Sequence, residues 1–470
     1  MRIKAFWLKA FWLAVLIIGL IALMCYLYSP PNRWNISVAG EICSGLTPEQ
    51  NMKVCLEHRD KMVSAQTITP VKKTKSFVVS AYFDPRKDRI VLIGILYRLE
   101  TKNFQCYYLC SDSIYSKATE TVIHSDHFNF PYGTADFVCS LPLYCKTEYI
   151  FINVKDDSKL SNQFSFLKVQ NLNALKQSEH DSFDYNFTVC LPAMFGGYDN
   201  TLQFVQSLEM YRILGAEQVV LYYTNSSSIM QKVLKYYQQT GFVKVIPWPI
   251  TSYINVSRGW MYPDHGGDLH YYGQIVTLND CIYRNMYKSR YVMLNDIDEI
   301  ILPIKHNTWN ELMDFMLRAM PGNSIYYVEN HIFPFTVYEE NDTYVAKKWS
   351  VISGDDLDKQ NILQHTYREP DRPNVYNPTK LIVNPRSVLQ TSVHSVLEKL
   401  GKEIKIPFDV ARIYHLRVPL QSHLPKEKLI KDTSLWRYST LLIERVNNVF
   451  KASLLNDKTE NSGIMEENQV

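Results

Sequence analysis

The chain has 470 residues, too many for one ordinary hydrophobic core, and 46% of them are apolar while 21% are charged. This composition excludes a disordered protein and predicts two folded domains with appendages. The net charge is only +3, and no stripe of Lys and Arg interleaved with aromatic residues occurs, so we expect no nucleic-acid partner.

The N-terminus carries a short basic tail and then a long apolar segment. Residues 1–9 contain three basic side chains, and residues 10–28 are apolar and uncharged. As a helix, these 19 residues would span about 29 Å, the thickness of a bilayer core. A cleaved signal peptide is the alternative, but its apolar part is usually shorter and is followed by small residues. We therefore predict a single transmembrane helix, a type II signal anchor, with the chain after Tyr28 on the lumenal side.

The cysteines also favour a lumenal address. Eight of the nine follow the apolar segment, an even number that suits disulfide pairing in an oxidising compartment. Their spacing does not assign the pairs, and a zinc site is disfavoured because no Cys-x-x-Cys pair occurs. The eight are Cys43, Cys55, Cys106, Cys110, Cys139, Cys145, Cys190 and Cys281. N-glycosylation sequons, all lumenal on this topology, occur at Asn35, Asn186, Asn225, Asn255 and Asn341.

Two segments follow the predicted anchor. Residues 29–75 mix polar residues, prolines and lysines without periodicity, as expected of a stem that holds the globular part away from the membrane. From residue 76 the pattern changes to short β-rich runs separated by turn-forming clusters. These runs are FVVSAYF, RIVLIGILYRL, FQCYYLC, TADFVCSLPL and YIFINV. We predict a small β-sandwich-like domain over residues 76–172, the alternative being an extra layer of the next domain.

After a polar linker the pattern changes to strands that alternate with helices, over residues 185–450. This alternation predicts an α/β fold, with a mostly parallel Rossmann-type sheet and helices on both faces. Ligands bind such sheets at the carboxyl ends of the strands. Predicted strands cover 187–195, 216–224, 242–249 and 291–294, and predicted helices cover 201–215, 228–241 and 273–287. Residues 451–470 are polar and are expected to form a disordered tail.

Three acidic residues follow the buried strand at Tyr291–Leu294 in the segment YVMLNDIDEIILP. Asp296 and Asp298 are two positions apart, so in an extended segment their side chains point the same way. Two such oxygen ligands can hold Mn²⁺ or Mg²⁺ and leave positions open for the phosphate oxygens of a nucleotide-diphosphate donor. A solvated turn is the alternative, because a bare Asp-x-Asp is common. The buried strand before the acids and the alternating elements favour the metal site.

Several segments in a fixed order resemble glycosyltransferase family 92, over about residues 186–420. They include VCLPAMFGGY, LHYYGQIVTLNDCIYR, YVMLNDIDEIILP, TKLIVNPRSVLQTSVHSV and ARIYHLRVP. The resemblance implies a GT-A fold, an inverting mechanism, dependence on Mn²⁺ (or Mg²⁺), and UDP-galactose as donor. Animal members similar to this chain add β-1,4-linked galactose to core fucose or to terminal galactose of N-glycans. A Golgi membrane enzyme with a lumenal catalytic domain is therefore expected.

The resemblance also implies roles for single residues. Asp296 and Asp298 match the metal-binding pair, and Glu299 follows them as in the family's Asp-x-Asp-Glu, so we take these three as catalytic. His394 and His415 match two late histidines, one of which is expected to complete the metal site. We favour His394, since it follows a β-branched run that could place it at a strand end.

Contacts to the donor and the acceptor are less well defined. Lys380 and Arg417 are candidate diphosphate contacts, with an ordinary surface charge as the alternative. Gln274 is expected near the donor, although it equally suits the first turn of its helix. Inversion also needs a general base, which the sequence does not identify. Eligible carboxylates are Glu329, Asp355 and Asp356, the last two in a segment, residues 339–373, that could close over the substrates.

Two other functions fit the sequence. A glycan-binding ectodomain without turnover would use the β-rich domain as its binding module, and a transferase for another UDP-sugar would keep the same site. The expected partners are a glycoprotein or oligosaccharide acceptor, the membrane through the N-terminal anchor, and a second copy of the chain in a homodimer.

Overall fold

The computed structural model describes residues 64, 66–110, 114–143, 145, 147–155, 165–174, 182–339 and 357–455. The predicted cytoplasmic tail, the anchor at 10–28 and most of the stem lie outside these residues. No helix within the described ranges is both long and apolar enough to cross a membrane. The predicted tail at 451–470 begins with a π-helical turn, Lys451–Leu455, and its remainder lies outside the described residues.

The first domain is rich in β-strands and contains the five strands predicted there, as β2, β3, β4, β7 and β8. The short strands β5, β6 and β9 were not predicted, and β1 falls in the predicted stem. The bounds are β1 (Thr69–Pro70), β2 (Phe77–Asp84), β3 (Arg89–Tyr97), β4 (Phe104–Leu109), β5 (Ile114–Ala118), β6 (Glu120–Ile123), β7 (Tyr132–Ser140), β8 (Tyr149–Val154) and β9 (Leu167–Gln170).

These strands form one continuous nine-stranded sheet in the order β5-β4-β8-β9-β2-β3-β7-β6, with β1 paired to β2. The predicted sandwich-like pair of sheets is therefore corrected to a single sheet that folds around its own apolar core. Strand β2 is buried along its whole length, because its other face packs on helix α7 of the second domain. A strand buried on both faces shows no alternation, which explains its continuous apolar sequence.

The second domain contains another nine-stranded sheet, in the order β12-β11-β10-β13-β17-β15-β21-β14, with β20 paired to β15. Two pairs of short strands, β16 with β22 and β18 with β19, lie outside it. The bounds are β10 (Tyr185–Met194), β11 (Gln218–Tyr223), β12 (Val243–Pro247), β13 (Ser289–Leu294), β14 (Glu299–Pro303), β15 (Asn323–Pro334), β16 (Tyr367–Arg368), β17 (Thr379–Val383), β18 (Val388–Thr391), β19 (Val396–Lys399), β20 (Lys402–Lys405), β21 (Ala411–Arg417) and β22 (Ile430–Lys431).

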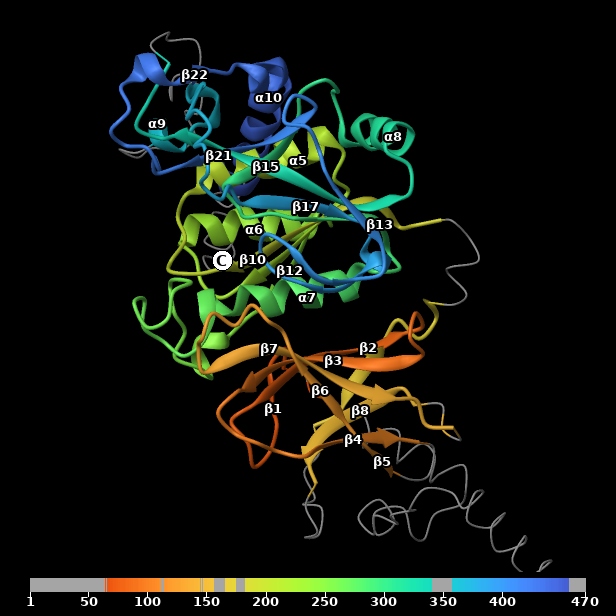
Figure 1. The fold of residues 1–470 in the computed structure, drawn as a ribbon. Coiled ribbons are helices and arrows are strands. Elements are labelled where there is room, and N and C mark those ends of the chain that lie inside the picture. The colour runs from red at the N-terminus through yellow and green to blue at the C-terminus, as the bar shows by residue number, and fades with distance from the viewer. Residues whose placement is uncertain are drawn as a thin grey trace, which may run out of the picture.

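Helices cover the two faces of this sheet unequally (Figure 1). Helices α5 and α6 pack on one face, with α10 against α5. The opposite face is covered by α7 and then by the sheet of the first domain. The bounds are α5 (Thr201–Leu214), α6 (Ser228–Gln239), α7 (Gln274–Asn285), α8 (Trp309–Ala319), α9 (Leu357–Gln360) and α10 (Ser439–Phe450).

The predicted fold class, a GT-A-like Rossmann-type sheet that is mostly parallel and flanked by helices on both faces, is wrong. The structure is rich in β-strands, and its second sheet is mixed. Parallel pairing runs from β12 to β13, but β17 is antiparallel to both of its neighbours and β14 is antiparallel to β21. The local elements between residues 185 and 294 match the prediction. Hydrophobic periodicity detects such elements, but it does not determine which strands become neighbours or in which direction they run.

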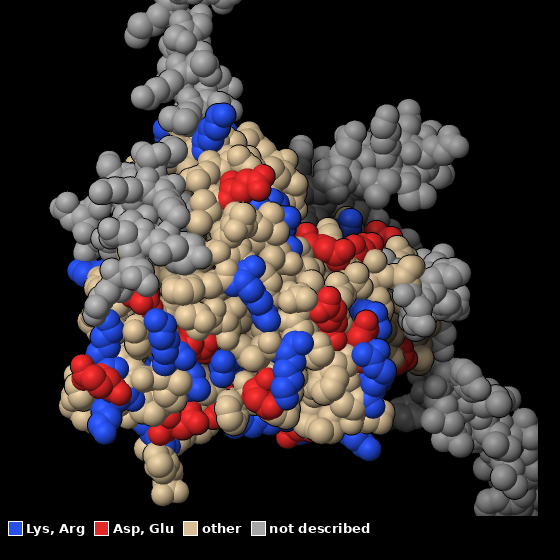
Figure 2. All heavy atoms as spheres, turned by 90° about the horizontal axis from the view of Figure 1, so that it is seen from above, with Lys and Arg blue, Asp and Glu red and all other residues tan. Residues whose placement is uncertain are grey.

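Charged side chains are mixed over the surface seen from above, and neither sign forms a large patch on that face (Figure 2).

The predicted presence of disulfides is confirmed. One bond joins β4 to β7 across the core of the first domain, a second joins the residue after β4 to the segment between β7 and β8, and a third joins β10 to α7. They are Cys106–Cys139, Cys110–Cys145 and Cys190–Cys281, while Cys43 and Cys55 lie outside the described residues.

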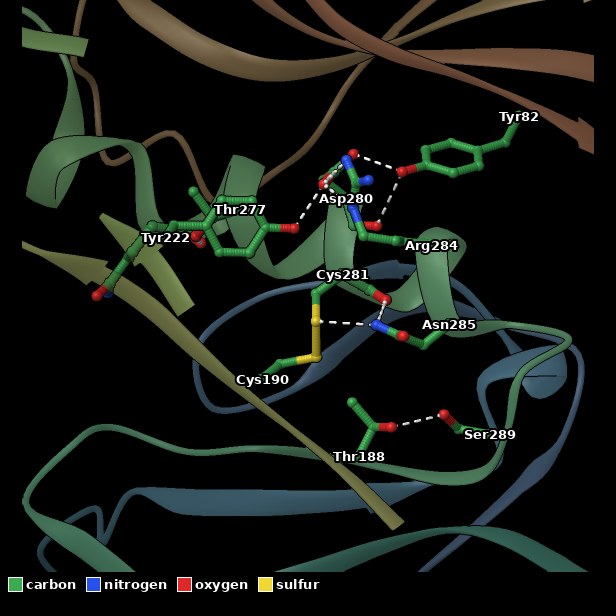
Figure 3. Close-up of a disulfide and its surroundings, with 11 residues drawn as sticks. Tyr82, Thr188, Cys190, Tyr222, Thr277, Asp280, Cys281, Arg284, Asn285 and Ser289 are labelled. Carbon is green, nitrogen blue, oxygen red and sulfur yellow. Dashed lines mark hydrogen bonds and ion pairs between the residues drawn. A yellow bond between two sulfur atoms is a disulfide. The ribbon is translucent and has the colours of Figure 1, made fainter. Parts of the chain in front are cut away.

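Helix α7 carries a buried charge cluster where the two domains meet (Figure 3). The fully buried carboxylate of Asp280 accepts hydrogen bonds from the hydroxyls of Tyr82, Ser80 and Tyr222. Arg284, one turn further along α7, donates to it at 2.9 and 3.0 Å. Burial raises the pKa of Asp280, but the charge of Arg284 and the hydroxyl donors outweigh burial and hold that pKa below its ordinary value. The cluster thus ties the first domain to the second through one satisfied carboxylate.

Candidate functional site

The predicted acidic residues lie at the carboxyl end of β13. Asp296 and Asp298 occupy the turn between β13 and β14, and Glu299 begins β14. The backbone amide of Asp296 donates to a carboxylate oxygen of Glu299 at 3.0 Å, and the hydroxyl of Tyr211 donates to the carbonyl of Glu299 at 2.6 Å. Since β13 is almost entirely buried and β14 is buried throughout, the apolar flanks hold the turn in one place.

A buried lysine neutralises part of this acidic charge. The ammonium of Lys380, on β17, lies 2.8 Å from a carboxylate oxygen of Asp296 and 3.3 Å from one of Glu299. Burial lowers the pKa of Lys380, but the two carboxylates raise it by more, so it lies above its ordinary value. Burial also raises the pKa of Glu299. Lys380 therefore supports the acids from behind rather than lining the open space in front of them.

His415, on β21, binds the other side of the acid cluster. Its Nε2 lies 3.2 Å from a carboxylate oxygen of Asp298, and its Nδ1 lies 3.3 Å from Glu299 and 3.1 Å from the amide oxygen of Asn330. Burial lowers the pKa of His415, but the two carboxylates raise it above the ordinary value. Strand pairing brings His415 here, because β21 is antiparallel to β14 and His415 lies opposite Glu299 in that pair.

His394 approaches the acids from a different loop. Its Nδ1 lies 3.0 Å from the backbone carbonyl of Thr379, so Nδ1 carries the proton that it donates. This leaves the lone pair on Nε2, as in metal-bound histidines, whose other ring nitrogen is usually held by a carbonyl or a carboxylate. Burial and then the charge of Lys380 lower the pKa of His394 to about 4. His394 is therefore neutral at neutral pH.

The donor set fits a divalent cation by the type of its atoms. Asp296 and Asp298 are 34% and 39% exposed, so each presents oxygen atoms to the cavity. Carboxylate oxygens and imidazole nitrogen are ligands that Mn²⁺ accepts. Within the described ranges, no three His, Cys, Asp or Glu side chains are already grouped as metal ligands. Lys380 and His415 hold the two carboxylates instead, so a cation would compete with these side chains.

The acids open onto a cavity of about 1050 Å³. Gln274, the first residue of α7, and Arg417, the last residue of β21, both line it. The Nε atom of Arg417 is buried and has no hydrogen-bond partner among the described residues. Of the predicted site residues, the cavity is lined by Asp296, Asp298, Glu299, Gln274, His394, His415 and Arg417, and Lys380 lies directly behind them.

Of the three eligible bases, Glu329 alone falls within the described residues, and the structure does not bring it to this cavity. Glu329 does not line it, and its carboxylate is held by Lys405 at 2.9 Å and by Asn377 at 3.1 Å. Asp355 and Asp356, with part of the predicted closing segment, lie outside the described residues.

Other cavity residues were not predicted, because they come from segments distant from the acidic motif. Asp126 and Phe128 belong to the first domain, and Trp260 and His270 precede α7. The available signal was the density of aromatic and polar side chains in two segments between predicted elements, HSDHFNF and RGWMYPDHGGD. Such a signal marks a surface loop of interest, but it does not indicate which cavity the loop reaches.

Comparison with known proteins supplies a family context for this geometry. Residues 185–451 match the model of a family described as glycosyltransferase family 92. A Caenorhabditis elegans protein named beta-1,4-galactosyltransferase is 31% identical over 128 residues, which cover 26% of this chain and 27% of that protein. Two C. elegans proteins named glycosyltransferase family 92 protein are 24% and 21% identical over 230 and 267 residues. These two matches cover 49% and 55% of this chain, and 41% and 50% of the relatives. The matches thus span between about a quarter and half of the length of each relative.

Proposed function

The chain belongs to glycosyltransferase family 92, and on that basis we propose that it transfers galactose from UDP-galactose to fucose or galactose of N-glycans, in β-1,4 linkage. The family match covers more than half of the chain, so the protein is a glycosyltransferase. The relative named beta-1,4-galactosyltransferase supports the choice of galactose and of the linkage.

The observation that carries this function is the pair of partly exposed carboxylates at the edge of the large cavity. A nucleotide-diphosphate sugar is anionic, so bare carboxylates would repel it. Lys380, from behind, and His415, from the cavity wall, offset part of their charge. A bound Mn²⁺ or Mg²⁺ would supply the remaining positive charge and stabilise the departing diphosphate. Asp296 and Asp298 would hold that cation, with His394 or His415 as a further ligand.

Two further side chains of this chain are suited to the donor. Arg417 presents a guanidinium with an unpartnered buried Nε at the cavity wall, and a planar guanidinium suits bidentate phosphate binding. Gln274 lines the cavity at the start of α7, where an amide can hydrogen-bond to a hydroxyl or phosphate oxygen. Both would orient the donor rather than take part in bond breaking.

We also propose that the protein is a single-pass type II enzyme of the Golgi membrane, anchored by residues 10–28. The three disulfides support a lumenal site, because such bonds persist in oxidising compartments. The acceptor would then be a glycoprotein or oligosaccharide in the lumen.

Purified full-length protein should release UDP from UDP-galactose when Mn²⁺ and a fucosylated or galactosylated N-glycan are present. EDTA should stop this release. Asp298→Asn should lower kcat/KM by about 10³-fold, since it removes one of the two carboxylate ligands of the proposed cation. Asp409→Asn is the matched control, because Asp409 is an exposed acid outside the cavity.

Full activity of Asp298→Asn would contradict the metal site. Turnover of a different sugar nucleotide would keep the enzyme class and change the donor. Glycan binding without turnover of any sugar nucleotide would favour a binding module and contradict the proposed activity.

A further inference from the structure

The first domain reaches into the cavity that contains the acid cluster. Asp126 and Phe128, in the loop of residues 124–131 between β6 and β7, line the same cavity as Asp296 and Asp298. Trp260, in the segment between β12 and α7, lines it beside them, and this segment runs next to β7 (Figure 1). The wall therefore combines side chains from both domains.

Specific contacts hold the loop in this position. The hydroxyl of Ser392, two residues before His394, donates to the carboxylate of Asp126. The ring of Phe128 stacks on that of His270 with centroids 4.6 Å apart. The backbone amide of Tyr132 donates to the carbonyl of Asp268 at 3.0 Å, just after the loop. The loop is thus fixed against the second domain.

Aromatic rings are exposed on this wall. Trp260 is 51% exposed, and its ring meets Phe128 edge to face at 6.2 Å. Tyr376 is 72% exposed, lines the cavity and lies within electrostatic reach of both Asp126 and Lys380. Large aromatic side chains left in water commonly mark a binding surface, and their faces suit the apolar C–H faces of a sugar ring.

Backbone strain is concentrated in the same wall. Eight non-glycine residues have a positive φ in the described parts of the chain, and four of them belong to these two segments. The φ angles are 47° at Phe128, 63° at Asn129, 39° at Tyr271 and 54° at Tyr272. Bulky residues rarely adopt this conformation, and where they do, the strain is often connected with function.

The charge of the wall indicates what it recognises. Only one of the side chains named on this wall, Asp126, is charged, and its charge is negative. The others are aromatic: Phe128, Trp260, Tyr271 and Tyr376. A diphosphate would be repelled there, whereas the hydroxyl groups of a neutral sugar can donate hydrogen bonds to a carboxylate. Arg417 and the acid cluster lie on other elements that line the same cavity.

We propose that this wall, formed by Asp126, Phe128, Trp260 and Tyr376, is the acceptor subsite, and that it binds the neutral, hydroxyl-rich end of an oligosaccharide. The inference rests on the proposed transferase function. It assigns to the first domain a direct part in choosing the acceptor, with no part in binding the donor.

Trp260→Ala and Phe128→Ala in the full-length protein test this subsite. Each should raise the KM for a neutral oligosaccharide acceptor about tenfold, since one aromatic contact is worth roughly that factor. The KM for the donor and the acceptor-independent hydrolysis of the donor should change less than about twofold. Phe408→Ala is the matched control, because Phe408 is an aromatic residue of similar exposure, 47%, outside the cavity.

An equal rise in the donor KM, or an unchanged acceptor KM in Trp260→Ala, would overturn the proposal. Trp260 is half exposed, so this variant remains informative if Phe128→Ala fails to fold. Capping the acceptor with a carboxylate-bearing sugar should also weaken binding in the wild type, and less so in Asp126→Asn. Equal weakening in both proteins would exclude Asp126 from recognition.

Calorimetric titration with the neutral oligosaccharide separates this proposal from the proposed function. If the wild type turns over no sugar nucleotide, the transferase proposal fails, but binding that is lost in Trp260→Ala and kept in Phe408→Ala still supports a glycan subsite. If turnover occurs and both Trp260→Ala and Phe128→Ala bind the acceptor as the wild type does, the subsite proposal fails and the transferase proposal stands.

Discussion

Two clusters of acidic and basic side chains lie at the two ends of the chain segment 280–299, and they differ in access to solvent. Asp280 is completely enclosed, and three hydroxyls and Arg284 satisfy its carboxylate. Asp298 has a partner in His415 but remains 39% exposed at the wall of a large cavity. A closed and satisfied cluster can only hold elements together, whereas an open one can exchange its partners for a ligand. Access to solvent, rather than charge, thus distinguishes the enclosed Asp280 from Asp298, the proposed metal ligand.

Replacing each of the two aspartates with asparagine, one at a time, is the strongest test of this comparison. Asp280→Asn should lower the free energy of unfolding by about 3–5 kcal/mol, because it leaves Arg284 buried without its charged partner. Asp298→Asn should change that free energy by less than about 1 kcal/mol, since its carboxylate is partly solvated. Denaturant unfolding of both variants measures the difference. Similar losses of stability in the two variants would remove the distinction.

Removing the disulfide beside the closed cluster is expected to have the next largest effect on the free energy of unfolding. Cys190 and Cys281 are 91 residues apart, so their bond restricts a long loop of the unfolded chain. Replacing both with alanine should lower the free energy of unfolding by about 2–4 kcal/mol. The rate of transfer per folded molecule should remain near that of the wild type. A loss of activity without a loss of stability would mean that the bond positions Gln274 at the start of α7.

Acid should titrate the closed cluster only at low pH. The pKa of Asp280 is lower in the folded protein than its ordinary value of 3.8. Its contribution to stability is therefore fully present above about pH 4 and is lost as the pH falls through the folded pKa. The stability difference between wild type and Asp280→Asn should be constant from about pH 5 to pH 8. Below about pH 3.8 it should shrink by roughly 1.4 kcal/mol per pH unit. A difference that already changes near pH 6 would assign the titration to another group.

The smallest effect is expected for a surface ion pair that also joins the two domains. Lys87 and Glu398 are 3.4 Å apart and 39% and 46% exposed. Lys87→Ala should change the free energy of unfolding by less than about 0.5 kcal/mol, because solvent screens exposed pairs. Thermal unfolding at low and high salt measures this. A loss comparable to that of Asp280→Asn would show that contact across the domains, rather than burial, decides the strength of an ion pair.

Local features of the site could be predicted from the sequence. The buried strand before Asp296 and Asp298, and helix α7 beginning at Gln274, follow from apolar runs and helical periodicity. The positions of Lys380, His394, His415 and Arg417 came from motifs of a resembled family, and the structure brings all four to the acids. Their roles in binding metal and donor remain predictions.

The sequence by itself determined the elements of the protein, and only the tertiary structure decided how they are arranged. An apolar period specifies that residues form a strand, but neither the direction of β17 and β21 nor the union of the first domain in one sheet is a local property. The same limit hid Asp126 and Phe128, which lie about 170 residues before the acidic motif. They reach the cavity because the first domain packs on α7 and their loop contacts the second domain. Packing between distant segments is set by which buried faces fit one another, and a single sequence does not record that fit.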